Sequence, residues 1–158
     1  MRTLSLSPMN RLAGLAPLVV RIIAGIIMAA HGFQKLQAGP GNFGGFLAQL
    51  GVPLPTLMGY VVTLVELVGG ILLIVGLFSR LAALLLTIDL VVAILLVKVN
   101  VGLIAPPQQG AGAELDLALI AGFLVILFAG PGSLSVDRAL GIEEGVQQRP
   151  APRRVRGG

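Results

Sequence analysis

The chain has 158 residues, of which 56% are hydrophobic and 11% charged, and its formal net charge is +4. Soluble domains average about 45–50% apolar and roughly 25% charged residues, so this composition excludes an ordinary soluble protein and indicates one integral membrane domain. The absence of cysteine and the single histidine exclude disulfides, thiolate chemistry and a paired-histidine metal or haem site within the chain itself.

The first predicted transmembrane helix spans residues 12–33, after a short polar segment at 1–11 that is expected to lie in the cytoplasm. A span needs about 20 apolar residues, and this stretch provides them. It carries Arg21 near its middle and ends close to His31 and Lys35. An arginine at mid-depth costs roughly 2.5–3.5 kcal/mol, so we expect Arg21 to meet an acid on another helix.

A turn at residues 39–41 precedes a stretch that predicts a short helix capped by Asn42. Its apolar residues follow the spacing of one helical face: Phe43, Phe46, Leu47 and Leu50. A short amphipathic helix between two spans is expected to lie in the membrane interface.

The second and third spans are predicted at residues 56–78 and 81–99, joined by a tight turn. Glu66 lies at the centre of the second span, on a face of small and polar residues formed by Gly59, Thr63, Glu66 and Gly70. Asp89 lies near the midpoint of the third span, and Lys98 lies at its end. Both spans therefore carry an acid at mid-depth.

The fourth span is predicted at residues 115–129, opened by Glu114 and Asp116, and because it is short we expect either tilt or partial burial in the bundle. Residues 12–140 thus form an all-α bundle of four transmembrane helices. The basic tail, 141–158, has a disordered composition and no interleaved aromatic residues, so we expect it to contact anionic lipid and no nucleic acid.

Lysine and arginine counts favour both termini on the cytoplasmic side of a bacterial inner membrane. Eight arginines flank the spans on that side, against two lysines on the other: Arg2, Arg11, Arg80, Arg138, Arg149, Arg153, Arg154 and Arg156, against Lys35 and Lys98.

This orientation arranges the ionisable groups in two layers. Arg21, Glu66 and Asp89 are expected at similar depth, with one carboxylate paired to Arg21 and one proton shared by the two acids. The outer layer contains His31, Lys35, Lys98, Glu114 and Asp116. The resulting polar seam is either a ligand or proton pathway or a buried ion pair that sets helix packing.

Several stretches together resemble the DoxX family of small four-helix bacterial membrane proteins. They are AAHGFQK (29–35) after Arg21, LGVPLP (50–55), ELVGGILLIVGLFSRLAAL (66–84), Glu114, and GPGSLSVD (130–137). The resemblance assigns Arg21, His31, Lys35, Glu66 and Glu114 to the family's polar positions. Asp89 is outside that pattern and depends on the physical argument alone.

The resemblance implies a non-catalytic subunit or anchor of a membrane redox assembly, such as a quinol oxidase or an oxidative-stress complex. Its partner would be a membrane-associated oxidoreductase. No cofactor is intrinsic, and a quinone is the candidate ligand of the seam. The alternative is a small-solute transporter or proton relay that uses Arg21, Glu66 and Asp89. The glycine-rich second span also permits a homo-oligomer.

Overall fold

The computed structural model describes residues 13–106, 110–132 and 134–142. Within these ranges the chain is helical and contains no strand. The elements are η2 (Ala13–Leu15), α1 (Ala16–Ala38), α2 (Pro40–Gln49), α3 (Pro55–Val75), α4 (Ser79–Leu96), η3 (Lys98–Asn100), α5 (Glu114–Ala129) and α6 (Val136–Ala139).

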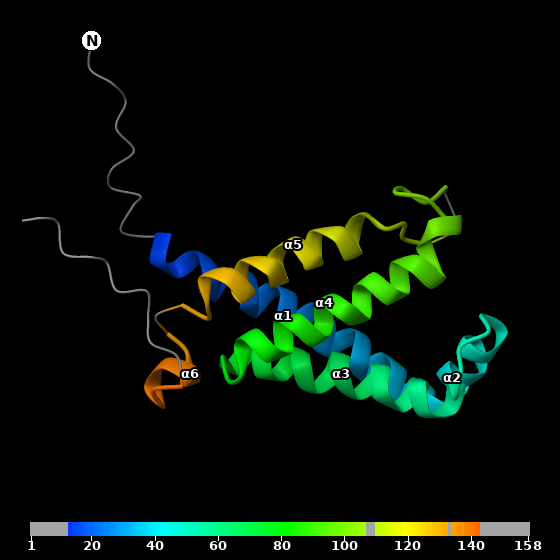
Figure 1. Cartoon of the computed structure of the whole chain (residues 1–158), viewed down its shortest axis with the longest axis horizontal. Helices are drawn as coiled ribbons and strands as arrows, with labels where there is room; N and C mark the ends of the chain where they lie inside the picture. Colours follow the sequence, from blue (N-terminus) through cyan, green and yellow to red (C-terminus); the bar gives the residue numbers. More distant parts are fainter. Residues whose placement is uncertain (1–12, 107–109, 133, 143–158) are drawn as a thin grey trace, which may run out of the picture.

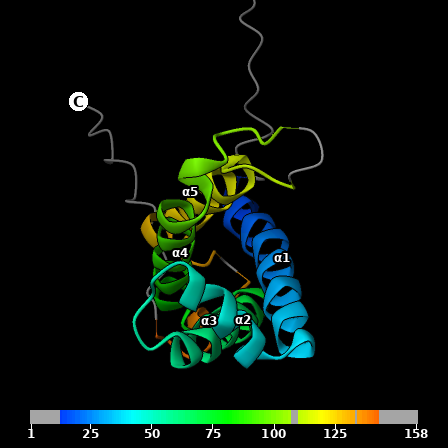
Figure 2. The same cartoon turned by 90° about the vertical axis from the view of Figure 1, so that its right-hand side faces the viewer.

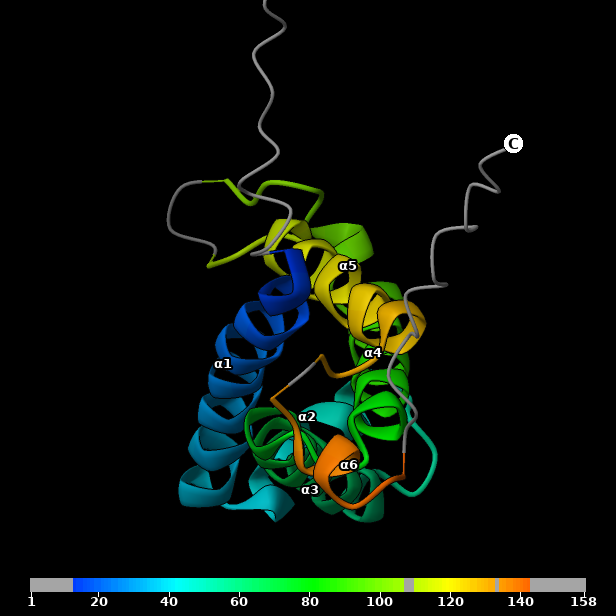
Figure 3. The same cartoon turned by 90° about the vertical axis from the view of Figure 1, so that its left-hand side faces the viewer.

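Helices α1, α3, α4 and α5 lie along the length of the molecule, with α1 and α4 in one direction and α3 and α5 in the other (Figure 1). Seen from one end, they form a ring in which α1 and α4 each pack against both α3 and α5 (Figure 2). The short helix α2 lies at the end where α1 finishes. At the opposite end, α6 lies against the turn between α3 and α4 (Figure 3).

Glycines bring α1 and α3 into backbone contact. A Cβ atom at Gly25 would lie 2.7 Å from the carbonyl oxygen of Gly70, and one at Gly32 would lie 2.7 Å from the Cα of Leu67. Helices in a membrane associate through such close packing, because lipid tails remove most of the hydrophobic driving force between them. The predicted face of the second span is confirmed as buried at Gly59, Thr63, Glu66 and Gly70.

Within the described ranges, three helices, α1, α3 and α4, are long and apolar enough to cross a bilayer. Helix α5 has 16 residues, which at 1.5 Å per residue gives about 24 Å against a hydrocarbon core of about 30 Å. The prediction of an all-helical membrane protein is confirmed. The fourth crossing and the interfacial position of α2 stay predictions.

Several helix boundaries differ from the sequence-based prediction: α3 ends at Val75 and not at residue 78, and α4 covers Ser79–Leu96 and not 81–99. Helix α1 begins at Ala16 and continues past Gly32 to Ala38, where Gly39 (φ 90°) and Pro40 stop it. Helix α2 begins at Pro40, and Asn42 lies inside it, where its amide donates to the carbonyl of Ala38. The predicted cap at Asn42 is therefore wrong. The polar N-terminal segment and almost all of the predicted tail lie outside the described residues.

Candidate functional site

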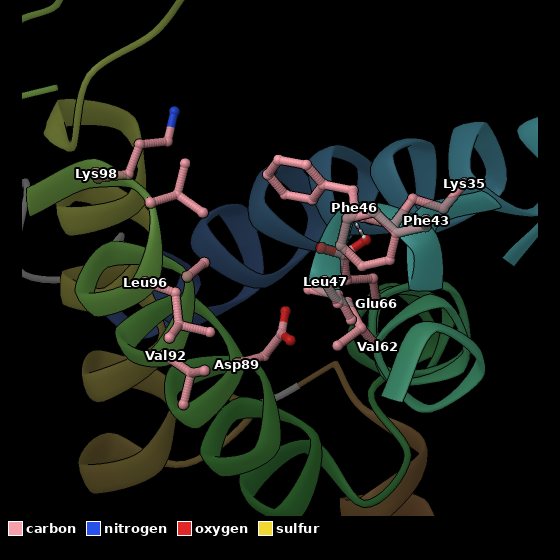
Figure 4. Close-up of a pocket in the computed structure, with 12 residues that line it drawn as sticks. Lys35, Phe43, Phe46, Leu47, Val62, Glu66, Asp89, Val92, Leu96 and Lys98 are labelled. Atoms are coloured by element: carbon pink, nitrogen blue, oxygen red, sulfur yellow. Dashed lines mark hydrogen bonds and ion pairs between the residues drawn. The ribbon is translucent and has the colours of Figure 1, made fainter. Parts of the chain in front are cut away.

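A pocket of about 180 Å³ lies among α1, α2, α3 and α4 (Figure 4). Its volume is comparable to the ~150 Å³ engineered cavity that binds benzene. The lining is apolar apart from four charged side chains: Lys35, Glu66, Asp89 and Lys98. Aromatic and aliphatic groups form the remaining walls: Phe43, Phe46, Leu47, Val62, Val92, Ala93, Leu96 and Val97.

Lys35 and Glu66 form an ion pair at this pocket, with Nζ 2.5 Å from Oε2. The contact follows from the helix packing. The backbone of Gly32 lies against Leu67, and Lys35 is one turn further along the same face of α1, so it meets antiparallel α3 at Glu66. Glu66 is 5% exposed. The Lys35 ammonium also lies 5.1 Å from the centre of the Phe43 ring.

Asp89 faces the pocket from α4 (Figure 4). It interacts electrostatically with Glu66 on α3, Lys35 on α1 and Asp116 on α5, which are two like charges and one opposite charge. In the described part of the chain, no cation lies within ion-pair distance of its carboxylate. Lys35 balances one of the two pocket carboxylates, so the group retains one negative charge until a proton or another cation joins it.

Helix α2 provides the aromatic wall, a role that its sequence did not predict. Glycines hold it against α3: a Cβ atom at Gly44 would lie 2.8 Å from the Cα of Thr56, and one at Gly59 would lie 2.9 Å from the amide nitrogen of Gly44. The rings of Phe43 and Phe46 are 6.0 Å apart and tilted by 30°. The face predicted to lie on lipid therefore contributes Phe43, Phe46 and Leu47 to the pocket.

The structure does not bring Arg21 to Glu66 and Asp89. Arg21 is 3% exposed, and its guanidinium donates to the carbonyl oxygen of Leu134 beside Gly76. The start of α1 at Ala16 places Arg21 close to that end of the helix, whereas the expected depth assumed a span from residue 12. Arg21 and Lys35 share the buried face of α1 but lie near its opposite ends, and Lys35 pairs with Glu66 instead.

Asp137 is a buried residue that sequence reasoning missed. Its carboxylate accepts hydrogen bonds from the backbone N–H groups of Phe78 (2.6 Å) and Ser79 (2.9 Å), at the start of α4, and it attracts Arg21 electrostatically. Its own N–H donates to the carbonyl of Gly76 at 2.8 Å. No local signal predicts these contacts, because the carboxylate's two partners are 59 and 58 residues away along the chain.

The predicted outer layer gathers around Asp116, at the end of the bundle that holds the start of α5. Asp116 interacts electrostatically with Lys98, His31, Glu114 and Lys35. One of its carboxylate oxygens is buried and has no hydrogen-bond partner among the described residues. His31 and Glu114 are exposed; the Nδ1 of His31 lies 2.8 Å from the carbonyl oxygen of Ile27. The ammonium of Lys98 donates to the carbonyl of Ala111.

Among the residues that the structure describes, no group of three or more histidine, cysteine or acidic side chains could hold a metal ion. The pocket instead combines an ion pair, a second carboxylate and aromatic walls. This arrangement suits a small organic molecule with one polar group, since ligand sites are mostly apolar with a few placed polar groups.

Comparison with known proteins gives a family match over most of the helical core. The sequence profile of the DoxX family matches residues 16–99, which include α1 to α4 and the whole pocket lining. No solved structure matches the chain.

Curated relatives from three bacteria cover most of the chain. The "Uncharacterized membrane protein Rv3486" of Mycobacterium tuberculosis is 33% identical over 132 residues, covering 77% of this chain and 78% of its own length. The "Putative oxidoreductase CatD" of Bacillus subtilis is 33% identical over 129 residues, covering 82% and 90%. The "Inner membrane protein YphA" of Escherichia coli is 28% identical over 125 residues, covering 77% and 87%.

Proposed function

The chain belongs to the DoxX family of membrane proteins, and from this premise we propose that it is a non-catalytic subunit of a membrane redox assembly. In this proposal the subunit itself holds a small ligand in the pocket at Lys35, Glu66 and Asp89. The observation that carries the proposal is a cavity beside an intramembrane ion pair. An ion pair that only set helix packing would require no adjoining space, because protein interiors are otherwise close-packed. Charges inside apolar helices also tend to mark ligand and ion pathways.

The redox context is supported by the relative named "Putative oxidoreductase CatD" and by the chemistry of this chain. With no cysteine and one histidine, the sequence offers no thiol pair and no paired-histidine site of its own. The electron-carrying group in this proposal therefore belongs to a partner oxidoreductase. This chain would anchor that partner at the bilayer and position the ligand.

A quinone headgroup is small enough for the pocket and matches its apolar lining. A six-membered ring fits a volume similar to that of the benzene cavity, and Phe46, Val92 and Leu96 offer apolar surfaces to it. Lys35 is the donor that would bind a quinone oxygen, although Glu66 already engages it. While Asp89 is ionised, its carboxylate can only accept hydrogen bonds, so it cannot donate one to a quinone oxygen. A bound quinone would supply reversible two-electron chemistry to the partner.

Purification of the tagged full chain in mild detergent tests this proposal. We expect a stoichiometric oxidoreductase or a small extracted ligand to accompany the wild-type protein, as measured by mass spectrometry of proteins and lipids. Recovery of the protein with neither companion would contradict the proposal.

Glu66→Gln should reduce the amount of co-purified ligand at least tenfold, because Lys35 then loses its partner and the pocket loses its fixed donor geometry. Glu114→Gln makes the same chemical change on an exposed carboxyl group outside the pocket and should retain the ligand. Equal ligand content in the two purified variants would show that the ion pair takes no part in binding.

A proton relay is the second candidate function, and one observation favours it. A succession of electrostatic interactions leads from the pocket to the surface: Asp89 interacts with Glu66 and with Asp116. Asp116 in turn interacts with His31 and Glu114, which are exposed. Arg21, which the sequence-based hypothesis included, lies at the other end of α1 and outside this path. Liposomes that contain only this protein should then show proton flux, and Asp89→Asn should abolish it. A wild-type preparation without flux would remove this candidate.

We place the protein in the inner membrane with both termini on the cytoplasmic side. The relative named "Inner membrane protein YphA" and the arginine bias of the flanking segments support this placement. A homo-oligomer is also proposed, because α5 is shorter than the hydrocarbon core and oligomerisation is one way in which a membrane accommodates a short helix. Reporter fusions at each terminus and the mass of the detergent-solubilised complex test the two proposals.

A further inference from the structure

We infer that the pocket selects a small aromatic or aliphatic cation, such as a protonated amine, over a neutral molecule of the same shape. This inference rests on the proposed ligand-binding function and names a charged class of ligand in place of the neutral quinone. It follows from two features of the pocket, which are the net charge of its ionisable side chains and the aromatic rings of α2 in its wall.

The charge balance of the pocket leaves a place for one positive charge. Lys35 and Glu66 neutralise each other at 2.5 Å, whereas Asp89 shares the attraction of Lys35 and faces the like charges of Glu66 and Asp116. Asp89 and Glu66 can hydrogen-bond to each other only while one of the two acids holds a proton. A partly buried carboxylate without a cation of its own is costly in an apolar environment. Lys98 also lines the pocket, but its ammonium points away from Asp89 and donates to the carbonyl oxygen of Ala111 (Figure 4). Its charge acts on Asp116 and is not among those that act on Asp89.

The rings of α2 suit the same ligand. The Lys35 ammonium already lies over the Phe43 ring, so this wall accommodates a cation against an aromatic face. Phe46 lines the pocket next to Phe43, at 6.0 Å between ring centres, and is 41% exposed. A ligand ammonium between Asp89 and Phe46 would therefore gain a charge pair and a cation–π contact.

Binding of such a cation should exchange with a proton. The group formed by Lys35, Glu66 and Asp89 is neutral with one added positive charge, which either a proton or the ligand can supply. The titratable groups that interact with Asp89 are Glu66 from α3, Lys35 from α1 and Asp116 from α5. We therefore expect ligand binding to release a proton and to weaken as the pH falls.

The test compares benzylammonium with benzyl alcohol, which share a ring and differ in charge. With the full chain in detergent, we expect calorimetry to show benzylammonium binding at least tenfold more tightly. Asp89→Asn should lower its affinity to that of the alcohol, and Phe46→Leu should weaken the cation more than the alcohol. Phe128→Leu, the matched control for Phe46→Leu, removes an exposed ring that does not line the pocket and should change neither affinity.

Each outcome decides a separate point. Equal affinity for the two probes in the wild-type protein, or an unchanged preference in Asp89→Asn, overturns the cation inference and leaves the pocket as a site for neutral ligands. Absence of binding by both probes overturns the cation inference together with the proposed pocket function. Because Phe46 is half-exposed, Phe46→Leu provides a folded variant even where Asp89→Asn fails to accumulate.

Discussion

Gly70→Ala should destabilise the protein by about 3 kcal/mol, whereas Gly69→Ala, at the preceding residue of the same helix, should stay within about 1 kcal/mol of the wild type. A Cβ atom at Gly70 would lie 2.7 Å from the carbonyl oxygen of Gly25 and 2.9 Å from the Cα of Ala29. Both are backbone atoms of α1, so the clash is relieved only when the two helices move apart.

Gly69 provides a matched control because it faces a different helix. A Cβ atom there would lie 3.2 Å from the Cγ of Leu86 and 3.4 Å from that side chain's two methyl carbons, which can shift by a few tenths of an ångström. The better helix propensity of alanine, about 0.5–1 kcal/mol over glycine, offsets that small strain.

The stabilities of the two variants can be compared by thermal unfolding in detergent, with the folded fraction measured by size-exclusion chromatography. Unfolding in sodium dodecyl sulfate, monitored by circular dichroism, provides a second comparison. Gly32→Ala checks the same interface from α1, because its Cβ atom would lie 2.7 Å from the Cα of Leu67. Equal stability of Gly69→Ala and Gly70→Ala would show that α1 and α3 are not in backbone contact.

Asp137→Ala is the second substitution with a large expected effect, a loss of about 3–5 kcal/mol. Asp137 is fully buried and accepts from the N–H groups of Phe78 and Ser79. Phe78 has a left-handed backbone (φ 48°), which costs roughly 1–2 kcal/mol for a residue with a side chain. The substitution leaves two donors and the Arg21 guanidinium without their acid.

Arg138→Ala is the control for this prediction, since it removes an exposed side chain next to Asp137 and should change stability by less than about 0.5 kcal/mol. Asp137→Asn retains one carbonyl oxygen as an acceptor and should fall between the two. A double-mutant cycle with Arg21→Met measures the electrostatic part. Full additivity of Arg21→Met and Asp137→Ala would show that the two residues do not interact.

The positions of helices α1 to α5 and the buried small-residue face of α3 were predictable from the sequence, whereas α6 was not. Each depends on local periodicity, which repeats within one helix and requires no knowledge of its neighbours. Glu66 was identifiable as a buried acid for the same reason, because an acid at the centre of a long apolar helix must face the bundle.

Tertiary structure decided which charges meet. Arg21 and Lys35 lie on the same face of α1, so the helical periodicity of the sequence does not distinguish which of them meets Glu66. The choice depends on where α1 starts and on its depth against α3, which the glycine contacts at Gly25 and Gly32 determine. Arg21 and Lys35 are fourteen residues apart, about 21 Å along the helix axis, so only one of them can lie at the depth of Glu66.

The contacts of Asp137 and the aromatic wall of the pocket also emerge only in three dimensions. The carboxylate of Asp137 meets residues 58 and 59 positions away, and α2 turns Phe43 and Phe46 toward α3 and α4 because Gly44 and Gly59 allow close approach. The sequence by itself therefore determined the helices and their buried faces, which arise from local spacing. Only the fold decided the partners of each charge, because electrostatic and hydrogen-bond contacts depend on distances across helices that no local pattern records.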